Sequence, residues 1–128
     1  LLVSSEIASG LDILELVPSE FLTENEIESS RTVVLDHFNV QGKQIFKLPA
    51  TISLAQAYLD QLERSGVRCA EGLDMARQAL SLLEEAPAAE RQAGLTEMAT
   101  HLIHLAAESE DSERLSALAE TVKELAAG

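Results

Sequence analysis

"CAEGLDMARQALSLLEEA", residues 69–86, carries apolar side chains at alternating steps of four and three residues. This heptad spacing places one apolar stripe along an α-helix, and such a stripe is buried by packing against neighbouring helices. The stripe consists of Cys69, Leu73, Ala76, Leu80 and Leu83. The segment therefore predicts an amphipathic helix within a helical core.

The segments on both sides of it show the same kind of periodicity. Residues 51–66 precede it, and residues 87–109 and 111–128 follow it. The apolar positions that we expect to face inward are Ile52, Ala55, Leu59, Leu62, Leu95, Met98, Leu102, Leu105, Ala106, Leu115, Leu118, Val122 and Leu125.

Residues typical of helix ends separate these segments. Ser53 and Gln56 have capping-box spacing, Gly66 suits a helix end, and Pro87 is tolerated in a first turn. Because the connections are only a few residues long, consecutive helices should be antiparallel neighbours. The sequence thus predicts a mainly α-helical single domain, in which residues 52–127 form an antiparallel up-down four-helix bundle.

Residues 1–50 allow more than one interpretation, and we expect a helical or mixed segment there. Residues 5–17 can form a helix with Ile7, Leu11 and Leu14 inward, but residues 11–17 can also form a strand. Thr23 and Glu26 have the spacing of a capping box, which predicts a helix from about Glu24. Residues 31–48 resemble two strands around the turn NVQG, a short hairpin. We favour the helix followed by an extended segment.

Charge and composition exclude several classes of function. The formal charge is −13, from 9 basic and 22 acidic residues, so the chain should be repelled by nucleic acids and anionic membranes. No apolar run approaches the roughly 18 residues of a transmembrane helix.

Cys69 is the single cysteine and cannot form an intrachain disulfide. The chain begins LLVSSEI, so we expect a removed signal peptide or a missing N-terminal piece, and the compartment stays open.

Two histidines form the first candidate site. Glu97, His101, His104 and Glu108 fall within an arc of ~60° on a helix, opposite the stripe that contains Leu102. Imidazole and carboxylate groups are ligands for zinc and related divalent metals. The helix of zinc proteases carries two histidines four residues apart, and this spacing is absent here. The main interpretation is therefore that these four residues form a solvated face of the helix. A divalent metal ion is the one cofactor that we consider.

The chain also resembles histidine phosphotransfer domains, although only in architecture. Those domains are acidic four-helix bundles of about this size with an exposed histidine in mid-helix. Their motif continues with a basic residue and a glycine within about one turn, whereas His101 is followed by Leu102, Ile103 and His104. The resemblance implies a phosphate-carrying histidine, and the departure from the motif puts that role in doubt.

The second candidate site is a window without acidic residues, between Asp36 and Asp60. Aromatic side chains within polar surroundings are typical anchors of protein interfaces. The alternative is that these side chains cover one end of the helical core while the lysines extend outward. The candidate partner-binding residues are Phe38, Lys43, Phe46, Lys47 and Tyr58.

No catalytic motif accompanies these features. The chain has neither a G-x-S-x-G nucleophile elbow nor a phosphate-binding P-loop, and the heptad position of Cys69 predicts burial rather than reactivity. We therefore expect a non-catalytic helical module for protein interaction or assembly, with a protein partner or a second copy of the chain. A metal-binding bundle and a phosphotransfer-like domain are the alternatives.

Overall fold

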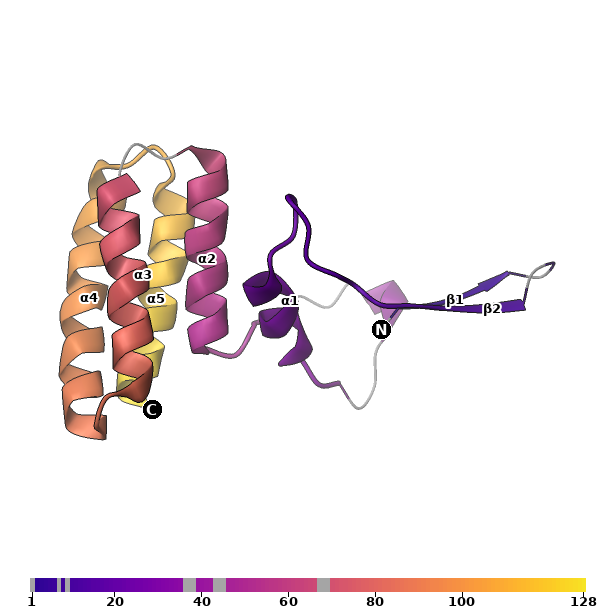
Figure 1. The fold of residues 1–128 in the computed structure, drawn as a ribbon, viewed down its shortest axis with the longest axis horizontal. Coiled ribbons are helices and arrows are strands. Elements are labelled where there is room, and N and C mark those ends of the chain that lie inside the picture. The colour runs from indigo at the N-terminus through magenta and orange to yellow at the C-terminus, as the bar shows by residue number, and fades with distance from the viewer. Residues whose placement is uncertain (1, 7, 9, 36–38, 43–45, 67–69) are drawn as a thin grey trace.

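The computed structural model describes all residues except 1, 7, 9, 36–38, 43–45 and 67–69. The protein is mainly helical, as the sequence predicts, and a two-stranded antiparallel hairpin stands at its N-terminus (Figure 1). The elements, in chain order, are β1 (Leu2–Glu6), β2 (Gly10–Leu14), α1 (Glu24–Arg31), a 3-10 turn (Val40–Gly42), α2 (Ile52–Ser65), α3 (Ala70–Glu85), α4 (Ala88–Glu108) and α5 (Ser112–Ala127).

Helix α2 shows how local signals place the helix ends. The hydroxyl of Thr51 accepts a hydrogen bond from the backbone N–H of Leu54, which makes Thr51 the N-cap. The capping box expected at Ser53 and Gln56 is therefore wrong, because the helix begins earlier and Gln56 is buried inside it. Gly66 ends the helix as predicted, with a φ of 74° that glycine adopts without steric cost.

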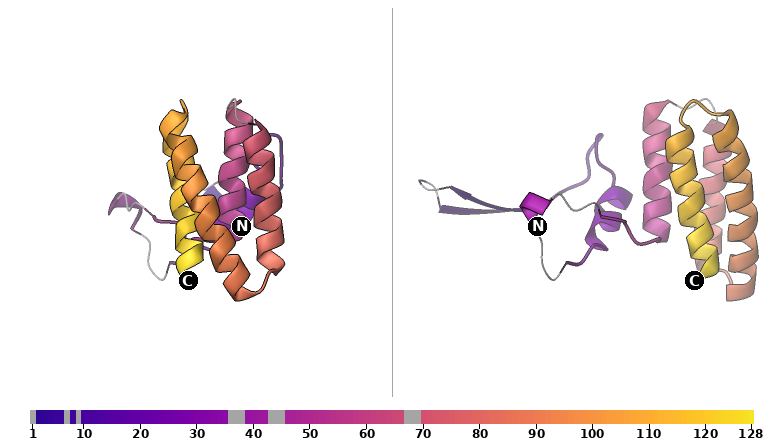
Figure 2. Two further views of the ribbon diagram at one scale, coloured as in Figure 1. Left: turned by 90° about the vertical axis from the view of Figure 1, so that its left-hand side faces the viewer. Right: turned by 180° about the vertical axis from the view of Figure 1, so that it is seen from behind.

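Helices α2, α3, α4 and α5 share one apolar core. Each consecutive pair is in contact, and α5 also returns to α2. The helices lie side by side and the chain reverses between them (Figures 1 and 2). The completely or almost completely buried leucines and valine are Leu59, Leu62, Leu73, Leu80, Leu95, Leu102, Leu115, Leu118 and Val122.

Helix α1 begins where the sequence predicts and packs against α2. The Thr23 hydroxyl accepts from the N–H of Glu26, and the Glu26 carboxylate accepts from the N–H of Thr23, so the capping box is confirmed. Ile27, on the same helix, is buried. An eight-residue helix is not stable alone in water, so its contact with α2 is what keeps it folded.

The N-terminal hairpin lies in a different place from the one considered in the sequence. Strands β1 and β2 pair from Leu2 with Leu14 to Glu6 with Gly10, so the helix considered for residues 5–17 is wrong and the strand alternative is confirmed. In residues 31–48, the described part contains no strand, and the NVQG turn is a 3-10 turn over Val40–Gly42. Local alternation favours strands at both places, but among the residues that the structure describes only β1 and β2 meet in antiparallel register.

Candidate functional site

Strand β2 and the chain that follows it form an apolar arm, which we define as residues 10–21. Leu11 and Ile13 point to the same side of β2 because side chains alternate along a strand, and both are more than 60% exposed. Val17 and Phe21 continue the arm at 69% and 76% exposure. Within the part of the chain that is described, neither strand contacts a helix, and the hairpin extends away from the helical core (Figures 1 and 2).

This exposure is costly for an isolated element. A two-stranded hairpin is at best marginally stable in water, because it cannot bury an apolar face on its own. Scattered exposed apolar residues are ordinary, but a contiguous group of them marks an interaction surface. The arm is therefore a part of the described surface that would gain stability from being covered.

A group of polar side chains joins α1, next to the arm, to the helical core. Asp60 on α2 accepts hydrogen bonds from the Thr23 hydroxyl at 2.6 Å and from the Asn25 amide at 2.9 Å. On its other side, Asp60 forms an ion pair with Arg77 of α3 at 2.8 Å. Because only 10% of the Asp60 side chain is exposed, this carboxylate ties α1, α2 and α3 together from a largely covered position.

Glu26 provides the second tie between α1 and α2. Its two carboxylate oxygens accept from the two terminal nitrogens of Arg64 at 2.7 and 3.1 Å, the paired geometry that suits a guanidinium group. Gln61 donates to the same carboxylate at 3.0 Å. The hydrogen bond from Arg64 lowers the pKa of Glu26 from 4.5 to about 2, against an opposing effect of burial. The charged carboxylate is thus the form that holds α1 in place.

In the window without acidic residues, the segment 46–48 lies against α2 and α5. Phe46, Lys47 and Tyr58 line a hollow of ≈ 230 Å³ together with Glu120 and Glu124 of α5. Lys47 forms an ion pair with Glu124, which raises the pKa of the lysine. Phe46 is 42% exposed, and Tyr58 is half-buried against the core. The structure therefore brings these three predicted residues together, whereas Phe38 and Lys43 lie outside the described residues.

Replacing Phe46 with aspartate should separate an interface role from a structural one. The new carboxylate would face Glu120 and Glu124 across the hollow, yet Phe46 is exposed enough that we expect a loss of at most about 1 kcal/mol in the free energy of unfolding. Urea denaturation would measure that loss, and sedimentation would measure association, which should weaken. Phe46→Leu, which keeps an apolar side chain, serves as the control. Unfolding of the Phe46→Asp protein would assign Phe46 to the core and contradict the partner-binding prediction.

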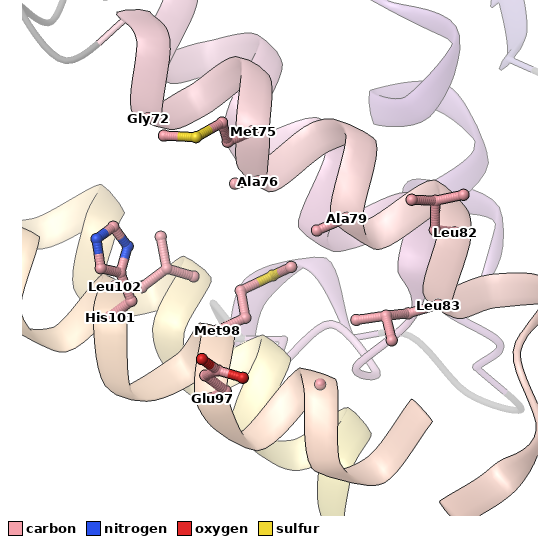
Figure 3. Close-up of a pocket in the computed structure, with 11 residues that line it drawn as sticks. Gly72, Met75, Ala76, Ala79, Leu82, Leu83, Glu97, Met98, His101 and Leu102 are labelled. Carbon is pink, nitrogen blue, oxygen red and sulfur yellow. The ribbon is translucent and has the colours of Figure 1, made fainter. Parts of the chain in front are cut away.

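The four residues of the first candidate site are all exposed, as a solvated face requires: Glu97, His101, His104 and Glu108. Glu97 and His101 lie on the edge of a groove between α3 and α4 (Figure 3), and His104 and Glu108 follow on α4. Among the residues that the structure describes, no three His, Cys, Asp or Glu side chains are grouped so that they could hold a metal ion. Cys69 lies outside this part, so the prediction of its burial stays a prediction.

Sequence reasoning missed the features that organise this surface. Asp60 and Arg64 are 37 and 38 residues from their partners Thr23 and Glu26, a separation that no local pattern encodes.

No described helix is long and apolar enough to cross a membrane. The arrangement offers hydrogen-bonding strand edges, apolar side chains and carboxylates, which are groups suited to binding another polypeptide. Comparison with protein-family models, with curated proteins and with solved structures finds no match to the chain.

Proposed function

We propose that the chain is a single-domain, non-catalytic module for protein interaction or assembly. In this proposal, α2–α5 form an up-down four-helix bundle that serves as a rigid scaffold, and the arm is the element that meets the partner. The shared core of the four helices and the contact that α5 makes with α2 support the scaffold.

The observation that carries the proposal is the exposed arm. Leu11, Ile13, Val17 and Phe21 are each more than 60% exposed, on a segment whose strands touch no described helix. Burial of such side chains stabilises a complex by roughly 25 cal/mol per Å² of apolar surface before the costs of association. The free protein thus keeps apolar area that a partner can cover.

The anchoring of α1 explains how an exposed arm can still be directed. The arm leads into α1, which Asp60 and Glu26 hold against α2. Arg31 at the end of α1 also lies 3.8 Å from Glu15, just beyond β2. Because α1 fixes the base of the arm, the free arm has fewer orientations and loses less conformational entropy on binding.

The partner that fits the arm is a protein with a strand edge and an apolar face. Each outer edge of the two-stranded sheet presents backbone N–H and C=O groups that can pair with an added strand. The charge of −13 disfavours nucleic acids and anionic membranes as partners. A second copy of the chain can supply the same groups, so self-association belongs to the proposal.

Native mass spectrometry of untagged protein from its own source tests the proposal. We expect a mass above that of the monomer by a second polypeptide or a second copy. Replacing both Leu11 and Ile13 with serine should remove that additional mass, because it removes the apolar face of β2 and leaves the helices unchanged.

The matched control is Asp12→Ser, which introduces the same residue on the opposite face of β2 and should leave the complex intact. Far-UV circular dichroism would verify that both variants keep their helices. A bare monomer in the unaltered protein, or an equal effect of both substitutions, would contradict the role of the arm.

A further inference from the structure

The groove between α3 and α4 is a second hollow, besides the one that Phe46 lines, and no residue of the arm lines it. It has a volume of ≈ 490 Å³ (Figure 3). Small residues on both helices create it: Gly72 and Ala79 on α3, and Gly94 on α4. At Gly94 the helices approach so closely that a β-carbon would lie 2.6 Å from Leu83. Away from this close contact, the small residues leave space that no described side chain fills.

Large apolar side chains stand at the edge of this groove. Met75 and Leu82 lie seven residues apart, so they share one side of α3, and they are 63% and 74% exposed. Met98 extends from α4 toward α3 between them (Figure 3). Among the described residues that line the groove, only Glu97 and His101 are polar. The groove therefore combines an apolar interior with apolar side chains that are open to solvent.

Carboxylates on α4 border the groove without cationic partners. Glu97 lines the groove and is exposed. Glu90 is also exposed, and it lies seven residues before Glu97 and so shares its side of α4. In the described part of the chain, neither of the two forms an ion pair. A ligand with positive charges beside an apolar stripe would match this distribution.

We propose that the groove binds an amphipathic helix of a partner protein, with leucine-like residues in the groove and lysine or arginine residues beside them. The groove runs from Gly72 to Leu83 on α3, which is about 17 Å at 1.5 Å per residue and so matches about three helical turns. Apolar anchors at helical spacing are how a helix fills such a groove. Gly72 and Ala79 let the bound helix approach closely, because interaxial distance depends on the side chains at the contact.

Charge decides between this partner and a second copy of the chain. Two copies, each with a charge of −13, would bring the carboxylates of both grooves together, and like charges across an interface cost several kcal/mol. A basic helix instead gains attraction from the same groups and associates faster. The carboxylates of Glu90 and Glu97 therefore favour a basic partner.

The test uses a blocked synthetic peptide of about 14 residues, composed of leucine and lysine at helical spacing, and the full chain. Isothermal titration at near-physiological ionic strength should show one-to-one binding. Leu82→Glu should weaken it by about tenfold or more, because the loss of a buried apolar anchor outweighs the attraction between one added carboxylate and the lysines. Met75→Glu, on the same side of α3, should act in the same direction.

Ile103→Glu is the matched control, because Ile103 is also exposed, at 53%, but lies nine residues from Gly94 and thus on the opposite side of α4. It adds the same charge and should leave the affinity within about twofold of the unaltered protein. Equal effects of Leu82→Glu and Ile103→Glu on the affinity would overturn the proposal, since the binding would then not depend on the groove. Equal binding of a peptide with glutamate in place of lysine would also overturn it, as would a dimer of the protein alone that Leu82→Glu dissociates. These outcomes leave the arm untested and so distinguish the two proposals.

Discussion

Replacing Leu118 with alanine should lower the free energy of unfolding by about 2–5 kcal/mol. Leu118 lies in α5 with none of its surface exposed, within the core shared by α2–α5. The substitution removes buried apolar surface and leaves a cavity that the surrounding helices fill only in part. Since domains are stable by roughly 5–15 kcal/mol, this single change should remove a large share of the stability. Urea denaturation followed by far-UV circular dichroism measures it.

The matched control is Leu82→Ala, the same change on a leucine that is 74% exposed. It should change the free energy of unfolding by about 0.5 kcal/mol or less, because little surface is transferred from water at this position. A loss from Leu118→Ala as small as that from Leu82→Ala would show that Leu118 is not part of the core. A large loss from Leu82→Ala alone would show that the edge of the groove is a packed surface.

The helical core could be predicted from sequence because its information is local. A heptad stripe, such as Leu73, Ala76 and Leu80, identifies both the helix and the face that it buries. Glycine at Gly66 and the capping box at Thr23 likewise act within a few residues. The positions of these helices and of their ends can therefore be predicted from short stretches of sequence, although the stability of the helices comes from tertiary packing.

The N-terminal strands, the groove and the contacts between distant segments could not be predicted in the same way. Residues 10–14 and 31–35 both contain β-branched and apolar residues, and which of them forms a strand depends on a partner strand at the right distance. Leu82 and Met75 are apolar residues outside the heptad stripe, so a periodicity argument treats them as exceptions rather than as one edge of a groove. The pairs Asp60–Thr23 and Glu26–Arg64 join distant segments, and they emerge only from the tertiary structure.

Replacing Glu26 with glutamine should lower the free energy of unfolding by about 1–2 kcal/mol at pH 7. Glutamine keeps the shape of the side chain and can still accept from the N–H of Thr23, but it cannot form the paired charged contact with Arg64. We place the effect at this size because the Arg64 side chain is 34% exposed, so water screens the pair. The loss should concentrate in α1, and hydrogen exchange of residues 24–31 would detect it while α2–α5 stay protected.

The same substitution should make the protein less sensitive to acid. In the folded protein the pKa of Glu26 is lowered from 4.5 to about 2, so the unfolded chain takes up a proton first as the pH falls. The stabilisation by Glu26 is therefore complete above about pH 4.5 and disappears as the pH falls through about 2. The difference in unfolding free energy between the unaltered protein and Glu26→Gln should shrink across that interval. Glu28→Gln is the control, because Glu28 forms an ion pair with Arg31 on the exposed side of α1. This substitution should cost about 0.5 kcal/mol or less. A difference that stays constant between pH 5 and about 2, or equal effects of the two variants, would mean that Glu26 does not hold α1 through its charge.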